Sequence, residues 1–264
     1  MLLLEKTASL FLTFNEKTPL VHQITNNVTV NDCANITLAI GGSPVMASTP
    51  EEVEDMVQLD DALVINFGDF GPSTYEAMLR AGRAANKRNI PVIFDPVGVG
   101  ATRYRTEKAQ NLVKEVKVSV VRGNTSEVFS LIGGKAITQG VDAGEIPITS
   151  MELAQKAANE LGCVVVVSGK VDVVSNGVET VQIYNGDEIL TKVTGTGCMS
   201  TALIGCFAGI TDDTFLAAIA GISVMGIAGE RAKTAQGLGT FRVNLIDEIS
   251  KMDKESWEKG VRIE

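Results

Sequence analysis

CVVVV, at Cys163–Val167, is the most strand-like stretch of the chain. Successive side chains of a strand point to opposite faces of the sheet, so a run that is apolar throughout is buried on both faces. Ala62–Asn66 (ALVIN) and Pro91–Phe94 (PVIF) are apolar in the same way, and an amphipathic helical pattern covers Ser73–Asn89 between them. This alternation predicts an α/β fold, with a parallel sheet between two layers of helices.

Further strands and helices are predicted on either side of these runs. Leu20–Ile24 and Val118–Val121 have strand character, while Val171–Ser175 and Val178–Tyr184 flank Asn176-Gly177, a strong hairpin signal. The hairpin predicts an antiparallel edge on the parallel sheet. No repeat, linker or low-complexity tract interrupts this order, which favours a single domain over residues 1–264. Helices are predicted over Leu2–Asn15, Val30–Ile40, Glu107–Lys114, Ser126–Ile132, Ser150–Leu161, Met199–Ala208, Thr214–Gln236 and Arg242–Trp257.

Charge and composition argue against several classes of protein. The 264 residues include 23 Lys and Arg against 32 Asp and Glu, which gives a formal net charge of −9. An acidic chain without a basic patch is not expected to bind nucleic acid or an anionic membrane. No apolar run reaches the roughly 18 residues of a membrane-spanning helix, and Glu5 and Lys6 interrupt the N-terminal stretch where a signal peptide would continue. With four cysteines and no CxxC pair, the sequence predicts a reduced, cytoplasmic protein.

The residues that follow the predicted strands are the first candidates for a site, because open parallel sheets bind ligands beyond the carboxyl ends of their strands. Each of these segments on its own could be a turn or a helix cap. Their alignment along one edge of the sheet favours a site for a polyanion. The segments are Gly68-Asp69-Phe70, Asp95–Gly100, Arg122-Gly123-Asn124 and Ser168-Gly169-Lys170.

The segment Thr194–Cys198 (TGTGC) has the clearest chemical signature. It follows the strand-like Ile189–Val193 and opens the predicted helix Met199–Ala208. Glycines let backbone N–H groups turn toward a ligand, and a helix N-terminus carries a partial positive charge. The segment therefore predicts an anion hole for a transferring phosphoryl group. A turn needed only for tight packing is the alternative. Neither a Walker A pattern nor a complete dinucleotide fingerprint is present.

Two carboxylates on the same edge are candidates for a metal site. Asp95 and Glu127 could hold Mg²⁺ through waters, because Mg²⁺ is usually held by one or two carboxylates together with phosphate oxygens. The alternative is structural, since Asn124 or Thr125 could cap the helix that Glu127 begins. His22 is the only histidine, and we expect it to be buried and hydrogen-bonded. No His/Cys cluster has the spacing of a zinc site.

Five motifs follow one another along the chain: Val21–Asn26 (VHQITN), Gly42–Met46 (GSPVM), Phe94–Gly98 (FDPVG), Arg122-Gly123-Asn124-x-x-Glu127 and Thr194–Cys198. They resemble the motifs of the hydroxyethylthiazole kinases, thiamin-salvage enzymes of the ribokinase-like superfamily, and come in that family's order. The resemblance, which covers essentially the whole chain, implies a three-layer αβα sandwich. It also implies a transferase that uses ATP and Mg²⁺ to phosphorylate the primary hydroxyl of 5-(2-hydroxyethyl)-4-methylthiazole in thiamin biosynthesis, and a homotrimer with active sites between subunits.

The resemblance also assigns roles to residues at the matching positions. Cys198 would be the base that takes the proton of the substrate hydroxyl, where the wider superfamily usually has Asp. A helix N-terminus lowers the pKa of a thiol, so we expect some thiolate at neutral pH. The competing hypothesis is that Cys198 only packs against the thiazole and that a solvent or phosphate oxygen takes the proton. Gly195, Thr196, Gly197 and Cys198 would form the catalytic turn; Asn26, Val28, Met46, Gly68 and Gly195 would bind the thiazole; Arg122, Asn124, Ser168 and Thr194 would bind ATP; Asp95 and Glu127 would hold the metal.

Three alternative functions stay open. A kinase for hydroxymethylpyrimidine, pyridoxal or a sugar is disfavoured by Thr25-Asn26 and Pro44–Met46, which would build a compact apolar pocket. A repair dehydratase for hydrated nicotinamide cofactors would also use a glycine-rich anion hole, but it would need a wider cleft. A non-catalytic thiazole sensor would explain why Cys198 stands where Asp is usual, although the intact Asp95 and Glu127 argue against it.

Overall fold

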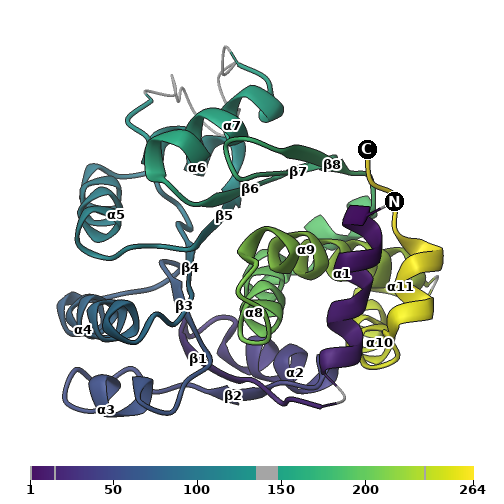
Figure 1. The fold of residues 1–264 in the computed structure, drawn as a ribbon, viewed down its shortest axis with the longest axis horizontal. Helices are drawn as coiled ribbons and strands as arrows, with labels where there is room; N and C mark the ends of the chain where they lie inside the picture. The colour runs from purple at the N-terminus through teal and green to yellow at the C-terminus, as the bar shows by residue number, and fades with distance from the viewer. Residues whose placement is uncertain (1, 15, 135–147, 235) are drawn as a thin grey trace.

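An eight-stranded sheet organises the chain (Figure 1). The computed structural model describes residues 2–14, 16–134, 148–234 and 236–264. The strand order is β2-β1-β3-β4-β5-β6-β7-β8; pairs from β2 to β6 are parallel, and β7 and β8 are antiparallel at one edge. The strands are β1 (Leu20–Ile24), β2 (Ser43–Val45), β3 (Ala62–Asn66), β4 (Val92–Asp95), β5 (Val120–Asn124), β6 (Val164–Ser168), β7 (Asp172–Ser175) and β8 (Thr180–Ile183). The predicted sheet with its edge hairpin is confirmed.

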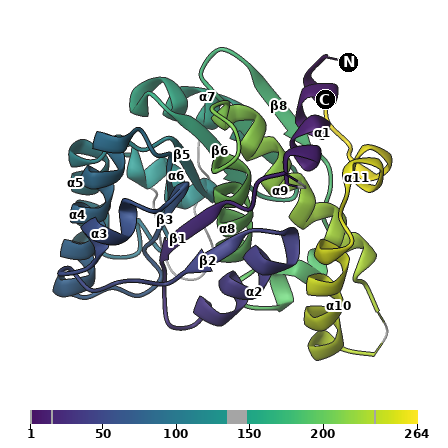
Figure 2. The same cartoon turned by 60° about the horizontal axis from the view of Figure 1, so that its bottom comes forward.

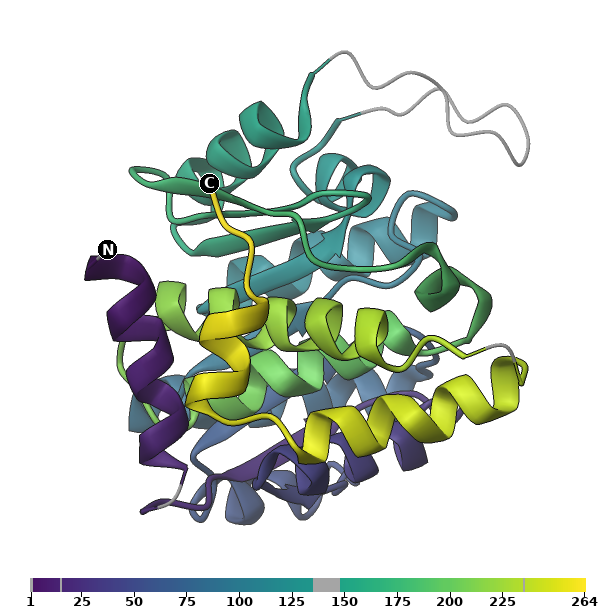
Figure 3. The same ribbon diagram turned by 90° about the vertical axis from the view of Figure 1, so that its right-hand side faces the viewer.

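Helices cover both faces of this sheet, which confirms the predicted three layers (Figure 1). One layer consists of α3 (Val53–Val57), α4 (Pro72–Arg88), α5 (Arg103–Glu115), α6 (Thr125–Leu131) and α7 (Ser150–Leu161). The other consists of α1 (Leu2–Thr13), α2 (Val30–Ile40), α8 (Thr196–Ala208), α9 (Thr214–Arg231), α10 (Leu238–Ser250) and α11 (Lys254–Gly260). Figure 2 shows α2 beside the edge strand β2, and Figure 3 shows α1, α10 and α11 outside α9.

The valine run of β6 explains why the sheet lies between two cores. Val164 and Val166 belong to the hydrophobic cluster that contains α8 and α9, whereas Val165 and Val167 belong to the cluster under α4 to α7. All four side chains are buried. Because alternate residues enter opposite clusters, a strand in the middle of the sheet has no position for a polar side chain until its last residue, here Ser168.

Several predicted elements are wrong or shifted. Ile189–Val193 is not a strand: Glu188–Lys192 forms a 3₁₀ helix, η1, because the Asp187 carboxylate accepts a hydrogen bond from the N–H of Ile189 (3.0 Å) and begins a helical turn. Arg242–Trp257 is divided into α10 and α11, since Asp253 caps a new helix through the N–H of Ser256 (2.8 Å).

Other boundaries move by a few residues. The strand predicted from Val118 begins at Val120 and extends to Asn124, and the helix predicted from Met199 begins at Thr196. The short elements β2 and α3 were not predicted as a strand and a helix. The predicted Thr214–Gln236 helix ends at Arg231; its residue 235 lies outside the described residues, as does Asn15 at the end of the predicted N-terminal helix.

Helix α9 corrects the expectation that no segment has the length and hydropathy of a membrane span. It has 18 residues and a mean hydropathy of 1.3, and it is the one such helix among the described residues. Yet 83% of this stretch is buried inside the protein, where α9 packs closely against α8. A Cβ at Gly221 would lie 2.6 Å from the Cα of Ile204, so the two backbones touch. The helix is part of the core.

Candidate active site

A cavity of about 330 Å³ lies where β1, β3, β4, β5 and β6 end, against the N-terminus of α8. The parallel strands bring their carboxyl ends together here, as the sequence predicted. Nearly all of the predicted site residues meet in this one place. Asn26, Val28, Gly68, Asp95, Arg122, Asn124, Glu127, Ser168, Thr194, Gly195, Gly197 and Cys198 line the cavity.

An adjoining cavity of about 860 Å³ shares Arg122, Ser168 and Gly197 with the first and extends between the β6–β7 loop, η1 and α9. The predicted Thr196 lines this second cavity. Sequence reasoning missed most of its wall, including Asp172, where burial raises the pKa of the carboxyl to about 6. Two features of the sequence pointed to this cavity: the hairpin signal at Asn176-Gly177, and the position of Ser168 at the end of a predicted strand. Tyr184, Asp187, Glu188, Leu190 and Met225 also line it.

The glycines of the α8 turn are required by what lies next to them. Gly195 has a φ of +86°, and a Cβ there would also lie 2.6 Å from Cγ2 of Thr29. A Cβ at Gly197 would lie 2.5 Å from Nη1 of Arg122, so the guanidinium rests directly on the turn. The first N–H groups of a helix have no acceptor inside it. The turn thus combines free backbone donors with a neighbouring cation.

Arg122 is the cation shared by the two cavities. Its Nη2 donates to the Ser168 hydroxyl (2.8 Å), which in turn donates to the carbonyl of Gly123 (3.2 Å). Its buried Nε has no acceptor among the described residues. A guanidinium with an unused donor at a helix N-terminus is suited to phosphate oxygens.

Asp95, the last residue of β4, is fully buried at the floor of the smaller cavity. Burial raises the pKa of its carboxyl to about 6, and the Glu127 carboxylate acts in the same direction, whereas Arg122 lowers it. Its Oδ2 accepts from Asn66 (2.8 Å) and Thr201 (2.9 Å). Its Oδ1 has no donor among the described residues. A buried carboxylate oxygen without a donor fits a cation partner.

Glu127 has the capping role that the sequence left open, and its carboxylate also reaches the cavity. Its Oε2 accepts from the N–H of Asn124 (2.9 Å) and completes a capping box at α6, while its Oε1 accepts from the N–H of Gly98 (2.8 Å). The same carboxylate lines the cavity beside Asp95. The described residues contain no group of three or more His, Cys, Asp or Glu arranged to hold a metal. Two carboxylates fit Mg²⁺, which takes its remaining ligands from water and phosphate.

Cys198 lies in the first turn of α8, with its Sγ 3.6 Å from Nδ2 of Asn26. Burial raises the pKa of its thiol, and the Asp95 carboxylate raises it further, while hydrogen bonds from Thr29, Asn66 and Asn26 lower it less. The expected net lowering of this pKa is therefore wrong, because desolvation and the Asp95 charge act in the opposite direction.

Two residues singled out from the sequence lie outside the cavities. His22 is buried as predicted: its Nδ1 contacts Asp60 (2.8 Å) and its Nε2 contacts the carbonyl of Ala47 (2.8 Å). Met46 follows β2 and is half-buried; it is not among the described residues that line either cavity of this one chain.

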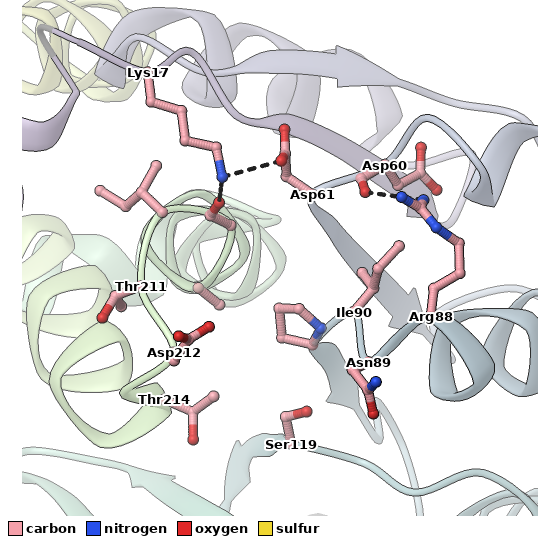
Figure 4. Close-up of a pocket in the computed structure, with 14 residues that line it drawn as sticks. Lys17, Asp60, Asp61, Arg88, Asn89, Ile90, Ser119, Thr211, Asp212 and Thr214 are labelled. Atoms are coloured by element: carbon pink, nitrogen blue, oxygen red, sulfur yellow. Dashed lines mark hydrogen bonds and ion pairs between the residues drawn. The ribbon is translucent and has the colours of Figure 1, made fainter.

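A further polar cavity of about 650 Å³ lies at the opposite, amino edge of the sheet (Figure 4). Its cations are already bound within the protein. Lys17 contacts the Asp61 carboxylate (3.1 Å) and the carbonyl of Gly209 (2.7 Å), and Arg88 donates to the carbonyls of Val57 and Asp60. These pairs leave little for a ligand to satisfy.

The architecture is that of ribokinase-like proteins. The solved structure of pyridoxal kinase from Staphylococcus aureus in complex with pyridoxal matches with a TM-score of 0.66 at 17% identity, over 94% of this chain and 98% of that one. This likeness establishes the fold. The hydroxyethylthiazole kinase structure from Pyrococcus horikoshii matches more closely, with a TM-score of 0.89 at 35% identity over 98% of both chains.

Sequence comparison narrows the class to one family. The model of the hydroxyethylthiazole kinase family matches residues 11–255. Hydroxyethylthiazole kinases from Ruminiclostridium cellulolyticum and Alkaliphilus oremlandii are each 49% identical, over 94% of this chain and 93% and 94% of their own length. The chain belongs to the hydroxyethylthiazole kinase family and is a kinase, as the motifs predicted.

Proposed function

We propose that the protein transfers the γ-phosphoryl group of ATP to the primary hydroxyl of 5-(2-hydroxyethyl)-4-methylthiazole, as a step of thiamin salvage in the cytoplasm. The observation that carries this proposal is that the α8 turn, Arg122, Asp95 and Glu127 line one cavity. Backbone donors, a cation and two carboxylates therefore share one space. This arrangement suits a transferring phosphoryl group and its metal.

ATP lies across the two cavities in this proposal. The larger cavity takes the nucleoside, and the phosphates run toward Arg122, Asn124, Ser168 and Thr194 at its junction with the smaller one. Asp95 and Glu127 would hold Mg²⁺, an ion that commonly keeps waters and phosphate oxygens among its ligands. When bound, the ion neutralises charge on the phosphate oxygens. The unused Nε of Arg122 and the free Oδ1 of Asp95 support this placement.

The transfer itself depends on the α8 turn. The oxygen of the substrate alcohol forms a bond to the γ-phosphorus as the bond between that phosphorus and the β–γ bridging oxygen breaks, which releases ADP. The backbone N–H groups of Gly195, Thr196 and Gly197 stabilise the charge on the phosphoryl oxygens. Cys198 receives the proton of the alcohol. Because burial raises the pKa of this thiol, only the fraction present as thiolate is competent, and a phosphate oxygen is the competing acceptor.

The thiazole ring lies against Asn26, Val28, Met46, Gly68 and Gly195 in a pocket between subunits of a homotrimer, with Asn26, Val28 and Met46 contributed by one subunit. Val28 lines the cavity and is yet 68% exposed in the single chain, which supports a pocket completed by a second subunit. Residues 1–264 form one kinase domain in this proposal, supported by the continuous sheet.

A panel of acceptors tests the proposal. ADP release is measured with ATP and Mg²⁺ in the presence of hydroxyethylthiazole, hydroxymethylpyrimidine, pyridoxal, ribose or hydrated NADH. Turnover confined to the thiazole alcohol is the expected result. Turnover with another acceptor would show that the thiazole alcohol is not the substrate. Tight binding of the thiazole without ADP release would identify a sensor.

A further inference from the structure

We infer that Asn66 and Thr201 are positioning residues that orient the Asp95 carboxylate toward the metal; the inference rests on the proposed function. Asn66 is the last residue of β3, Thr201 lies on α8, and both side chains are buried. Neither lines the cavity. Neither side chain is therefore placed to hold the metal itself, and Asp95 is the metal-site carboxylate that both contact.

Both side chains bind the same oxygen of Asp95. Nδ2 of Asn66 donates to Oδ2 over 2.8 Å, and Oγ1 of Thr201 donates to it over 2.9 Å. The carbonyl of Gly197, at 3.2 Å, is the more distant alternative acceptor for the single hydroxyl proton of Thr201. Rotation of the carboxylate would break both hydrogen bonds of a fully buried side chain. Oδ1 is thereby fixed as the oxygen without a donor among the described residues. Partners of this kind behind a metal ligand commonly change metal affinity about 10- to 100-fold.

The amide of Asn66 can face Asp95 only with its nitrogen. Its Oδ1 accepts from the N–H of Gly68 (2.8 Å) and from Nδ2 of Asn26 (2.8 Å). A backbone N–H cannot act as an acceptor, so the contact with Gly68 determines which end of the amide is the oxygen. Nδ2 is left to point at the carboxylate.

Asn26 is oriented by the backbone in the same way. Its Oδ1 accepts from the N–H groups of Val28 (3.1 Å) and Thr29 (3.2 Å). Its Nδ2 therefore faces Asn66 and the Sγ of Cys198. One directed chain of hydrogen bonds runs from Asn26, at the substrate end of the site, through Asn66 to Asp95.

Four variants separate this role from a merely structural one. Thr201→Val removes the hydroxyl donor to Asp95 without changing the shape of the side chain, and Thr201→Ser keeps that hydroxyl. Asn66→Ala removes the amide donor to Asp95. Thr37→Val is the matched control: Thr37 is buried on α2, donates to the carbonyl of Cys33 (2.9 Å) and accepts from Gln23 (2.7 Å), away from both cavities. Each variant is assayed for the Mg²⁺ concentration that gives half-maximal activity. Calorimetric titration with ADP, with and without Mg²⁺, measures metal-dependent binding without turnover.

We expect Thr201→Val and Asn66→Ala to raise the half-maximal Mg²⁺ concentration about tenfold and to weaken Mg²⁺-dependent ADP binding in proportion. Thr201→Ser should restore most of both, and Thr37→Val should change neither. If turnover falls in the two variants while both metal readouts stay at wild-type values, the inference is wrong. Should Asn66→Ala not fold, the Thr201 pair decides. A wild type that does not phosphorylate the thiazole alcohol refutes the proposed function, while the calorimetric comparison still tests the positioning role.

Discussion

At the scale of one residue, the buried Asp95 carboxylate lowers the stability of the folded protein at a position where the proposed reaction needs a metal ligand. Burial raises the pKa of its carboxyl from 3.8 to about 6. A carboxyl with a raised folded-state pKa stabilises the protein fully only below its unfolded pKa, and this stability is lost as pH rises through the folded value. Above pH 6 the ionised Asp95 is therefore a destabilising group in the absence of metal.

We expect Asp95→Asn to be inactive but more stable than the wild type at pH 8, by about 1–3 kcal/mol. The amide oxygen can still accept from Asn66 and Thr201. Urea unfolding in the absence of Mg²⁺ measures the difference, which should narrow as pH falls toward 4. A variant less stable than the wild type at pH 8 would show that the buried, ionised carboxylate does not destabilise the folded protein.

The Cys198 thiol gives a second prediction at this scale. A base must be deprotonated to act, and burial raises the pKa of this thiol. The turnover of the wild type should therefore still rise with pH above 9. Cys198→Asp should keep substantial turnover with its rise several pH units lower, and Cys198→Ala should lose about 100-fold or more. Equal rates for wild type and Cys198→Ala across the profile would assign the proton to a phosphate oxygen.

At the scale of the element, the N-terminal turn of α8 has little tolerance for a side chain. A Cβ at Gly197 would lie 2.5 Å from Nη1 of Arg122. We expect Gly197→Ala to displace the guanidinium and to lower kcat about 100-fold, while leaving a folded protein. Gly239→Ala is the control: Gly239 lies on α10, and a Cβ there meets nothing within 4 Å. Steady-state rates and thermal unfolding of both variants check this. Similar activity in the two variants would show that catalysis does not depend on the close contact between Arg122 and Gly197.

The elements differed in how well their sequence revealed them. CVVVV was recognisable because a strand buried on both faces admits only apolar residues. Ile189–Val193 looked the same over a short run, but the side chain of Asp187 caps a 3₁₀ turn there, and such local hydrogen bonds outweigh a weak pattern. The break between α10 and α11 similarly depends on the cap at Asp253.

At the scale of the whole molecule, the sequence predicted which residues lie together in the site. It did not predict how their surroundings change their pKa values. Strand ends such as Asp95 and Ser168 were predictable, because parallel strands bring these ends to one edge. The direction of the Cys198 pKa was not, since it depends on burial by distant segments and on Asp95 across the cavity. The position of Met46 away from the cavity could not be inferred from its motif either.

The exposed Val28 leads to a prediction about assembly. If the proposed homotrimer forms, with a second subunit over the thiazole end of the cavity, sedimentation should give a mass about three times the 28.0 kDa of the chain. We expect Val28→Asp to weaken the trimer and to raise the KM for the thiazole alcohol more than that for ATP. A monomer with full activity would contradict the proposed shared pocket.

The most direct test is to identify the product. Wild-type protein is incubated with ATP, Mg²⁺ and hydroxyethylthiazole, and the mixture is followed by ³¹P NMR. Phosphoryl transfer at this site predicts a phosphate-ester resonance that grows in step with ADP and is absent without the alcohol. ADP accompanied only by inorganic phosphate, or no ADP from a folded protein, would contradict it.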